Sequence, residues 1–352
     1  MKLTVRRFDL QLTHTWRVSS QSGVGQGKDF YPVVLLELES GAYQGMGEGA
    51  PSSRYAESAD TVEAFLRQVD PARLSFEDIP GSMNYLDSVA PGNYTAKAAL
   101  NLALVDGIAK AARLAVYDYL GLGFRENRHV TSFSIGIDEA DVIRKKVQNA
   151  QNYPILKIKV GGPDDEKNLR VVREVAPKKT IRVDANEAWT TKEEALRKIE
   201  WLATDKHIEF IEQPMPATSN PKEMAWLKER SPLPLFGDES YHHAADISRC
   251  VDCFHGVNVK LVKTGGITAG HEALRAARFA GLKTMIGCMI ESSLLITAAA
   301  HLAELADHLD IDGNLLIQND PFIGVSSKDG MLSFAQTPEA LGLRVRRNGL
   351  RA

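Results

Sequence analysis

Three acidic residues follow one another at nearly constant spacing in the middle of the chain. Asp184 lies in the run VDAN, Glu212 in IEQP and Asp238 in GDES, at intervals of 28 and 26 residues. Such intervals match one strand–helix repeat, so three consecutive parallel strands would bring the carboxylates to one rim. Crowded anions repel unless a cation joins them, and oxygen ligands favour a hard ion. We predict that these residues bind Mg²⁺, although any one alone could instead cap the following helix.

Lysines flank these acids on both sides. Lys157 and Lys159 lie two apart in LKIKVG, so both face the same side of a strand. Inside a barrel the two ammonium groups would repel each other, and one would lose its proton more easily and serve as a base. An exposed edge strand with solvated lysines is the alternative. Lys260, in VNVKLVKTGG, falls where an inward-facing base of a later strand would sit, and we expect Lys263 to be solvated.

The order of these residues predicts a reaction. Lys159 and Lys260 would lie on opposite sides of an eight-stranded ring, with the acids between them. One lysine could take a proton from one face of a carbon, and the other could return it from the opposite face. A proton next to a carboxylate is a very weak acid, because its loss creates an enediolate, and a metal ion stabilises that charge. We therefore predict magnesium-dependent proton transfer next to a substrate carboxylate.

A second acidic pair lies near the end of the candidate barrel. Asp310 and Asp312, in HLDIDGNLL, are two apart and would share one face of the last strand. Two carboxylates at the mouth of a barrel form a receptor for a cation, and they would be costly to bury without one. The alternative is that one of them caps the loop at Gly313.

The segment that must position these residues contains eight short apolar runs separated by helical patterns. Eight strand–helix repeats between about 128 and 319 favour a parallel barrel over an open sheet. The runs are 131–137, 155–161, 180–186, 208–214, 233–240, 256–262, 282–289 and 308–314. Segments 138–152 and 192–204, among others, have helical periodicity.

The segments that flank the barrel have a different pattern. Residues 1–125 read as an α+β unit, with strands at 2–12 and 32–39, a return strand starting within the turn-rich 41–49, and helices at 58–69 and 96–120. We expect a capping domain at 1–125, a barrel at 126–319, and a C-terminal return at 320–352 that packs on the capping domain.

Charge and apolar content exclude several classes of partner. The chain has 352 residues and a net charge of −3, and it carries no dense basic run of the kind that binds nucleic acid. The nearest approach is a set of tail arginines, which we expect to be solvated: Arg344, Arg346, Arg347 and Arg351. No stretch approaches the ~20 apolar residues of a membrane span, and the N-terminus lacks a signal-peptide core. We expect a cytoplasmic protein without a membrane partner.

The three cysteines indicate neither a disulfide framework nor a metal site. Their odd number fits a reducing compartment. Cys250 and Cys253 form a C-x-x-C near His255, but a zinc site needs a fourth ligand and usually a second pair.

Taken in order, these motifs resemble the enolase superfamily, in its muconate-lactonizing-like subgroup. The matching pieces are K-x-K (157–159), DAN (184–186), EQP (212–214), DES (238–240) and KxxKxGG (260–266). The resemblance covers essentially the whole chain and implies a modified (β/α)7β barrel with an α+β capping domain. It also implies one Mg²⁺ per subunit, a homo-oligomer, Lys159 and Lys260 as the catalytic bases, and Lys157 as a residue that tunes Lys159 and helps to neutralise the enediolate.

Within the subgroup, the paired aspartates indicate one reaction. They are similar to the feature with which dipeptide epimerases hold the substrate ammonium group. Ser134, and Met289 in GCMIESS, resemble substrate-contacting positions of the same enzymes. o-Succinylbenzoate synthesis, N-acylamino acid racemisation and muconate cycloisomerisation remain alternatives on the same framework. A non-catalytic barrel kept for binding or assembly is a third alternative. Such a barrel would be expected to have lost metal ligands or bases, whereas the three carboxylates and both lysines are present.

The loop at 17–31 should carry specificity. Gly23, Gly25 and Gly27 suit a mobile lid over the substrate. Relatives that act on L-Ala-D/L-Glu place an arginine here, whereas in this chain Arg17 lies early and Lys28 is nearest to the expected place. A lysine supplies the charge without the bidentate fork. We predict a dipeptide epimerase of the L-Ala-D/L-Glu type in which Lys28 binds the acidic side chain.

Overall fold

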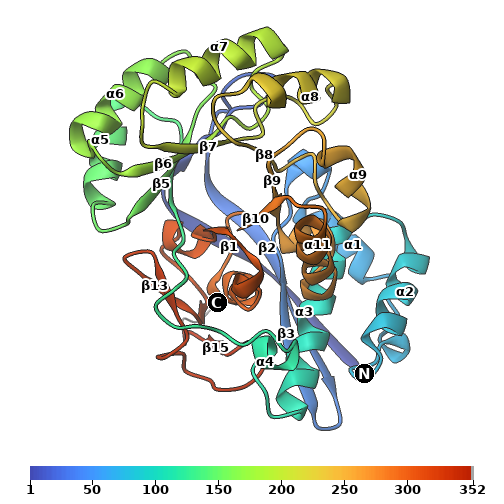
Figure 1. Ribbon diagram of the computed structural model, residues 1–352. Helices are drawn as coiled ribbons and strands as arrows, with labels where there is room; N and C mark the ends of the chain where they lie inside the picture. The colour runs from blue at the N-terminus through green and yellow to red at the C-terminus, as the bar shows by residue number, and fades with distance from the viewer. Residues whose placement is uncertain (350–352) are drawn as a thin grey trace.

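The computed structural model describes residues 1–349, so Arg351 of the basic tail lies outside the described residues. Its largest sheet has eight strands in the order β11-β10-β9-β8-β7-β6-β5-β4. Every neighbouring pair in this sheet is parallel. A bridge between Thr131 and Leu309 joins the first strand to the last and closes the sheet into a barrel (Figure 1). The predicted parallel barrel is confirmed.

Each strand of the barrel lies inside one of the eight predicted runs. The strands are β4 (Phe133–Ile135), β5 (Ile155–Lys159), β6 (Thr180–Asp184), β7 (Ile208–Glu212), β8 (Leu235–Gly237), β9 (Gly256–Val259), β10 (Lys283–Gly287) and β11 (His308–Asp310). The helices between them are α5 (Ala140–Asn149), α6 (Asp165–Val175), α7 (Lys192–Leu202), α8 (Pro221–Arg230), α9 (Ile247–Cys250), α10 (Leu261–Thr264), α11 (Ile267–Phe279) and α12 (Ser293–Ala300). None of the described helices is long and apolar enough to cross a membrane.

The side chains that point into the barrel form two layers. An apolar layer lies inside the barrel, and a polar layer lies next to it, nearer the carboxyl ends of the strands. Phe210, Phe236 and Met285 form a buried cluster inside the barrel. The next inward positions towards the carboxyl ends of β7 and β8 are Glu212 and Asp238, because side chains two apart face the same way. The polar end of the barrel is therefore built directly on an apolar floor.

The capping part consists of an antiparallel sheet and four helices. Its strands are β1 (Lys2–Trp16), β2 (Lys28–Ser40) and β3 (Tyr43–Gly49), and its helices are α1 (Ala59–Leu66), α2 (Ile79–Val89), α3 (Tyr94–Ala111) and α4 (Val116–Tyr119). Of the glycines in 41–49, Gly41 lies in the turn with φ 58°, and the others lie in β3. Gly45 and Gly47 belong to β3, and a Cβ there would lie 1.8 and 1.9 Å from the carbonyl oxygens of Ala103 and Ala99. The missing side chains let β3 pack directly on α3.

The single helix expected at 96–120 is in fact two helices. α3 ends because Arg113 adopts a left-handed conformation with φ 58°, and the Leu114 amide donates to the Ala109 carbonyl at 3.0 Å. This is a Schellman-type ending that apolar periodicity does not reveal. Between the two helices Ala115 bridges to Gly342 of the C-terminal segment, and the amide of Val116, the first residue of α4, donates to the Gly342 carbonyl at 2.9 Å.

The loop between the first two strands is shorter than the predicted 17–31. Trp16 pairs with Lys28, so the hairpin ladder continues and Lys28–Tyr31 belong to β2. Gly27 has φ +92°, and a Cβ there would lie 2.7 Å from the Thr15 side chain. This glycine allows the chain to turn tightly into β2.

The C-terminal segment contacts both parts of the molecule. β12 (Phe322–Ile323) pairs with β15 (Arg346–Arg347), and β13 (Ser326–Lys328) pairs with β14 (Met331–Ser333). The β14 residue Met331 bridges to Val130 at the entry to the barrel, whereas the Leu343 amide donates to Asp106 of α3 at 2.8 Å. Arg347 forms an ion pair with Glu37 of β2. In Figure 1 the red segment at β15 lies next to α4 of the cap.

A buried acid joins the cap to the barrel. Glu48 of β3 is fully buried and accepts hydrogen bonds from the amide (2.9 Å) and hydroxyl of Ser292, which caps α12. Burial raises the pKa of Glu48 to about 7, although the bonds from Ser292 oppose the shift. The neutral carboxyl therefore stabilises the fold fully below pH 4.5, and this contribution is lost as the pH rises through about 7.

Replacing Glu48 with glutamine should remove this pH dependence. Since one pKa unit corresponds to about 1.4 kcal/mol, the free energy of unfolding of the native protein should fall by about 3 kcal/mol more than that of the variant between pH 4.5 and 7. Urea unfolding at a series of pH values measures the difference. Equal pH dependence in the two proteins would contradict the assignment.

Candidate active site

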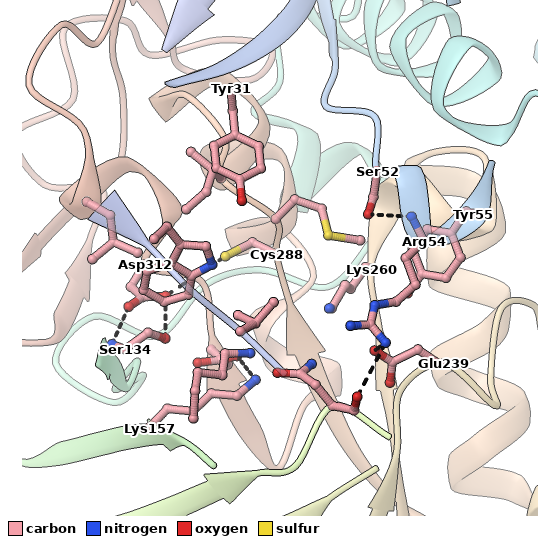
Figure 2. Close-up of a pocket in the computed structure, with 18 of the residues that line it drawn as sticks. Tyr31, Ser52, Arg54, Tyr55, Ser134, Lys157, Glu239, Lys260, Cys288 and Asp312 are labelled. Carbon is pink, nitrogen blue, oxygen red and sulfur yellow. Dashed lines mark hydrogen bonds and ion pairs between the residues drawn. The ribbon is translucent and has the colours of Figure 1, made fainter. Parts of the chain in front are cut away.

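A polar cavity lies between the cap and the carboxyl ends of the barrel strands. Its volume, taken as the space that the centres of water molecules can reach, is about 130 Å³. From the barrel come Ser134, Lys157, Lys159, Asn186, Glu239, Lys260, Cys288, Met289, Ile290, Asp310, Asp312 and Leu316. From the cap come Trp16, Val18, Tyr31, Pro51, Ser52, Arg54 and Tyr55. Figure 2 shows Tyr31 and Arg54 on the cap side, facing Lys157 and Asp312 on the barrel side.

Lys157 lies at the centre of the acidic groups. Its Nζ is 2.7 Å from Glu212, 3.0 Å from Asp184 and 2.6 Å from Asp310. Burial alone would lower the pKa of Lys157, but Asp184, Asp310 and Glu212 together raise it well above its usual value. Lys157 therefore stays protonated, so it is not the lysine of the pair that loses its proton more easily.

Lys159 and Lys260 enter the cavity from opposite sides of the barrel. Lys159 ends β5, and Lys260 directly follows β9, which lies four strands away in the ring of eight. Lys159 Nζ is 2.6 Å from Asp184, and Lys260 Nζ is 2.6 Å from Asp238. Burial lowers the pKa of Lys260 and the carboxylate of Asp238 raises it, with a raised pKa as the result.

The expectation of a solvated Lys263 is wrong. Its side chain is fully buried and donates to the Asp238 carboxylate at 2.5 Å and to the Asn258 carbonyl at 3.0 Å. α10 turns the chain back after Lys260, so Lys263 points beneath the rim rather than into the loop. Burial lowers the pKa of Lys263, against the influence of Asp238. Its role is to hold Asp238 in place.

The three acids predicted as metal ligands lie side by side. Asp184 ends β6, Glu212 ends β7 and Asp238 follows β8, and all three are completely buried. Because each turns towards a lysine or towards Asn258, no three carboxylate, imidazole or thiol groups within residues 1–349 converge at metal-ligand spacing.

The chemistry of this donor set nevertheless fits a divalent cation. Glu212 Oε2 has an ion-pair contact with Lys157 but no hydrogen bond. Burial, followed by the charge of Asp184, raises the pKa of Glu212 to about 7, with Asp238 adding to the shift. The carboxylates therefore crowd one another, and a cation that shares their oxygens would relieve the repulsion.

The aspartate pair is divided by the structure. Asp310 ends β11 and accepts from Lys157 and from the Ser132 hydroxyl at 2.6 Å each, so its charge is compensated. Asp312 lies beyond the strand and accepts hydrogen bonds only from neutral donors: the amide and the hydroxyl of Ser134, at 2.6 and 3.3 Å, and the thiol of Cys288, at 4.0 Å. Burial and then the charge of Asp310 raise the pKa of Asp312 to about 7. Ser134 thus aims Asp312 into the cavity (Figure 2).

The two other predicted substrate contacts differ in position. Met289 lines the cavity. Lys28 does not: it is exposed at the start of β2, and its Nζ lies 5.1 Å from the centroid of the Tyr31 ring. Arg17 forms an ion pair with Asp138 at 3.1 Å and also lies outside the cavity lining.

Several residues that organise the site were not predicted. Gln213 accepts from the amides of Asp238 and Ser240 at 2.9 and 3.2 Å, and Asn258 donates to Glu212 at 2.8 Å. Gln213 lies within the quoted EQP motif, which was the available signal. Nothing in the sequence indicated a role for Arg54 of the cap, because no local pattern shows that its side chain reaches the barrel.

The cysteine pair has ordinary structural surroundings. Cys250 donates to the Ser240 carbonyl and Cys253 to the Pro221 carbonyl, and both thiols are free and buried. His255 accepts from the Leu235 amide at 3.0 Å. Burial raises the pKa of both thiols, so neither is a reactive thiolate.

Comparison with known proteins settles the family. Residues 18–121 match the N-terminal domain of mandelate racemase and muconate lactonizing enzymes, and residues 140–338 match the enolase C-terminal domain-like family. The chain belongs to the enolase superfamily. This confirms the resemblance and accounts for the barrel with acids and lysines at its carboxyl end.

Several relatives with high similarity to this chain are epimerases. The chain is 61% identical to the L-Ala-D/L-amino acid epimerase of Pedosphaera parvula over 96% of its own length and 97% of the relative. It resembles the substrate-liganded structure of the L-Ala-D/L-Glu epimerase from Bacillus subtilis with a TM-score of 0.89, 25% identity and 97% of each chain covered. A dipeptide epimerase from Cytophaga hutchinsonii, complexed with Mg and D-Ala-L-Val, gives a TM-score of 0.88 and 26% identity over 99% and 95% of the two chains.

Proposed function

We propose that this protein is a dipeptide epimerase that inverts the α-carbon of the second residue of L-Ala dipeptides, L-Ala-L-Glu among them. The observation that carries the proposal is the pairing of two opposed lysines with an uncompensated carboxylate, Asp312, in one cavity. The relatives named above, which are epimerases of such dipeptides, support it.

The reaction is a proton exchange between the two lysines. In one direction neutral Lys159 removes the α-proton and protonated Lys260 donates a proton to the opposite face; in the other direction the roles reverse. The permanent charge of Lys157 offsets part of the negative charge of the enediolate. Mg²⁺, which Asp184, Glu212 and Asp238 would hold, would supply further positive charge at the substrate carboxylate. A divalent cation bound to Asp238 would offset the negative charge that now stabilises protonated Lys260, so Lys260 would lose its proton more readily in the loaded enzyme.

Asp312 distinguishes this reaction from the alternatives on the same scaffold. A buried carboxylate that receives only neutral donors is matched by a substrate ammonium group. The substrates of o-succinylbenzoate synthases and muconate cycloisomerases have no ammonium group, and those of N-acylamino acid racemases have an acylated nitrogen. These reactions leave Asp312 without a partner.

Incubation of L-Ala-L-Glu and other L-Ala dipeptides with the enzyme and Mg²⁺ in D₂O tests the proposal. Deuterium should enter at the α-carbon of the second residue together with inversion, as followed by NMR and chiral chromatography. EDTA should stop both processes and excess Mg²⁺ should restore them. Absence of α-deuterium across the whole panel would reject the function.

We also propose one Mg²⁺ per subunit, a homo-oligomer and a cytoplasmic location. Asp184, Glu212 and Asp238, which form one set of adjacent acids within residues 1–349, support the metal count. The homo-oligomer follows from the resemblance to the enolase superfamily. Metal analysis and analytical ultracentrifugation of the purified protein measure the first two quantities.

A further inference from the structure

We infer that the cavity selects dipeptides whose second residue has a large uncharged side chain, apolar or aromatic, over those with an acidic one. This inference rests on the proposed function and specifies its substrate class. It follows from the direction in which the second side chain must point, from the side chains that meet it, and from the partners of the nearby cations.

The direction follows from the geometry of proton transfer. In the enediolate the α-carbon is planar, and the two lysines must approach its two faces. The substrate carboxylate lies in this plane and must point to the three acids at β6–β8. The peptide nitrogen also lies in this plane, and it leads to the ammonium group of the first residue, which must point towards Asp312 beyond β11. The third substituent in the plane, the side chain, must leave in the remaining direction. Since the barrel floor is filled by Phe210 and Phe236, the open direction is towards the cap.

The cap meets this side chain with almost no charge. Of its seven side chains that line the cavity, six are uncharged: Trp16, Val18, Tyr31, Pro51, Ser52 and Tyr55. Tyr31 points into the cavity from β2 (Figure 2), and burial raises the pKa of Tyr31 to about 12, so its hydroxyl stays neutral. Ile290 and Leu316 add apolar surface from the barrel side. Such a wall gains free energy by burying an apolar side chain and loses it by desolvating a carboxylate.

The seventh side chain, Arg54, is already paired. Its guanidinium lies 2.6 Å from Glu187 and 3.2 Å from Glu239, and it donates to the Ser19 carbonyl at 3.1 Å. Glu239 also lines the cavity, and its Oε2 is buried without a hydrogen-bond partner. Arg54 therefore fastens the cap to two barrel loops and has no unmatched charge for a substrate carboxylate.

The other two cations of the lid region do not reach the cavity. Arg17 is held by Asp138, and Lys28 lies exposed outside the cavity lining, near the Tyr31 ring. Within the described residues, each cation of the lid and its surroundings is thus either compensated or turned away from the substrate. The pocket consequently discriminates against negative charge on the second side chain.

The test compares L-Ala-L-Phe, L-Ala-L-Leu, L-Ala-L-Gln and L-Ala-L-Glu with the holoenzyme, using α-deuterium exchange to obtain kcat/KM. Glutamine and glutamate have the same shape, so their ratio isolates the charge. We expect L-Ala-L-Phe and L-Ala-L-Leu to exceed L-Ala-L-Glu at least tenfold, and L-Ala-L-Gln to exceed L-Ala-L-Glu as well. Tyr31→Arg should narrow the Gln-to-Glu ratio, and the matched Tyr31→Phe variant should preserve it.

Two results would overturn the inference. One is a kcat/KM for L-Ala-L-Glu equal to or above that for L-Ala-L-Phe; the other is a selective loss of L-Ala-L-Glu turnover in Lys28→Ala, which would place that lysine on the acidic side chain. Exchange with none of the dipeptides would instead reject the proposed function itself, so the two failures can be told apart.

Discussion

Replacing Lys260 with alanine should abolish epimerisation but leave exchange of the α-proton in one diastereomer of the dipeptide substrate. The remaining base, Lys159, still faces one side of the α-carbon, so it can remove and return a proton there without inverting the centre. The Lys159→Ala variant should show the complementary behaviour with the other diastereomer. We expect inversion to fall by at least about 10²- to 10⁴-fold in each variant, the usual contribution of a positioned general acid or base.

The measurement is α-deuterium incorporation into the two diastereomers of one dipeptide in D₂O, with inversion followed in parallel. Lys263→Ala is an informative comparison, because Lys263 holds Asp238 but does not line the cavity. Its loss should reduce exchange with both diastereomers alike. If Lys159→Ala and Lys260→Ala also lost exchange with both, the assignment of one base to each face would be wrong.

Replacing Asp312 with asparagine should remove the charge that holds the substrate ammonium group. Loss of one partner from a buried charge pair costs roughly 2–5 kcal/mol, so kcat/KM for dipeptides should fall by about 30- to several thousand-fold. In the native enzyme, protonation of Asp312 at low pH should lower kcat/KM in the same way as the substitution. The pKa of free Asp312 is raised to about 7, so kcat/KM should fall as the pH drops below this value and the carboxyl becomes neutral.

An N-acylated amino acid is the matched substrate for this variant, because it has no ammonium group. Any activity of the native enzyme towards N-succinyl amino acids should survive Asp312→Asn, whereas dipeptide activity should not. Thermal unfolding of the variant serves as the control for folding. Dipeptide turnover that persists unchanged in Asp312→Asn would favour the reactions that need no ammonium site.

The motif residues carry most of the chemistry, and spacing along the chain was enough to find them. Asp184, Glu212 and Asp238 recur at the period of a strand–helix unit, and alternation within a strand places Lys157 and Lys159 on one face. Local rules of this kind need no knowledge of distant contacts. The barrel, the family and the set of residues around the reacting carbon were therefore available from the sequence.

Which groups touch was decided by tertiary structure. The sequence treats Lys157 and Lys159 alike, but three buried acids from β6, β7 and β11 surround Lys157 and keep it charged. The sequence likewise makes Asp310 and Asp312 a symmetric pair, whereas Lys157 compensates the charge of Asp310 and Asp312 receives only neutral donors. Burial and charge at such points depend on neighbours far apart in the chain.

The loop at 17–31 and the residues around it show most clearly which contacts the sequence does not predict. From its position in the chain, Lys28 was predicted to bind an acidic substrate side chain, and no role was predicted for Arg54. The hairpin ladder extends to Lys28 and turns it outward, while the packing of the cap on the barrel brings Arg54 against Glu187 and Glu239. The sequence by itself determined the fold and the proton-transfer chemistry, because both follow from periodic local patterns. Only the tertiary structure decided the charge that the substrate meets, because that charge is the sum of pairings between the cap and the barrel.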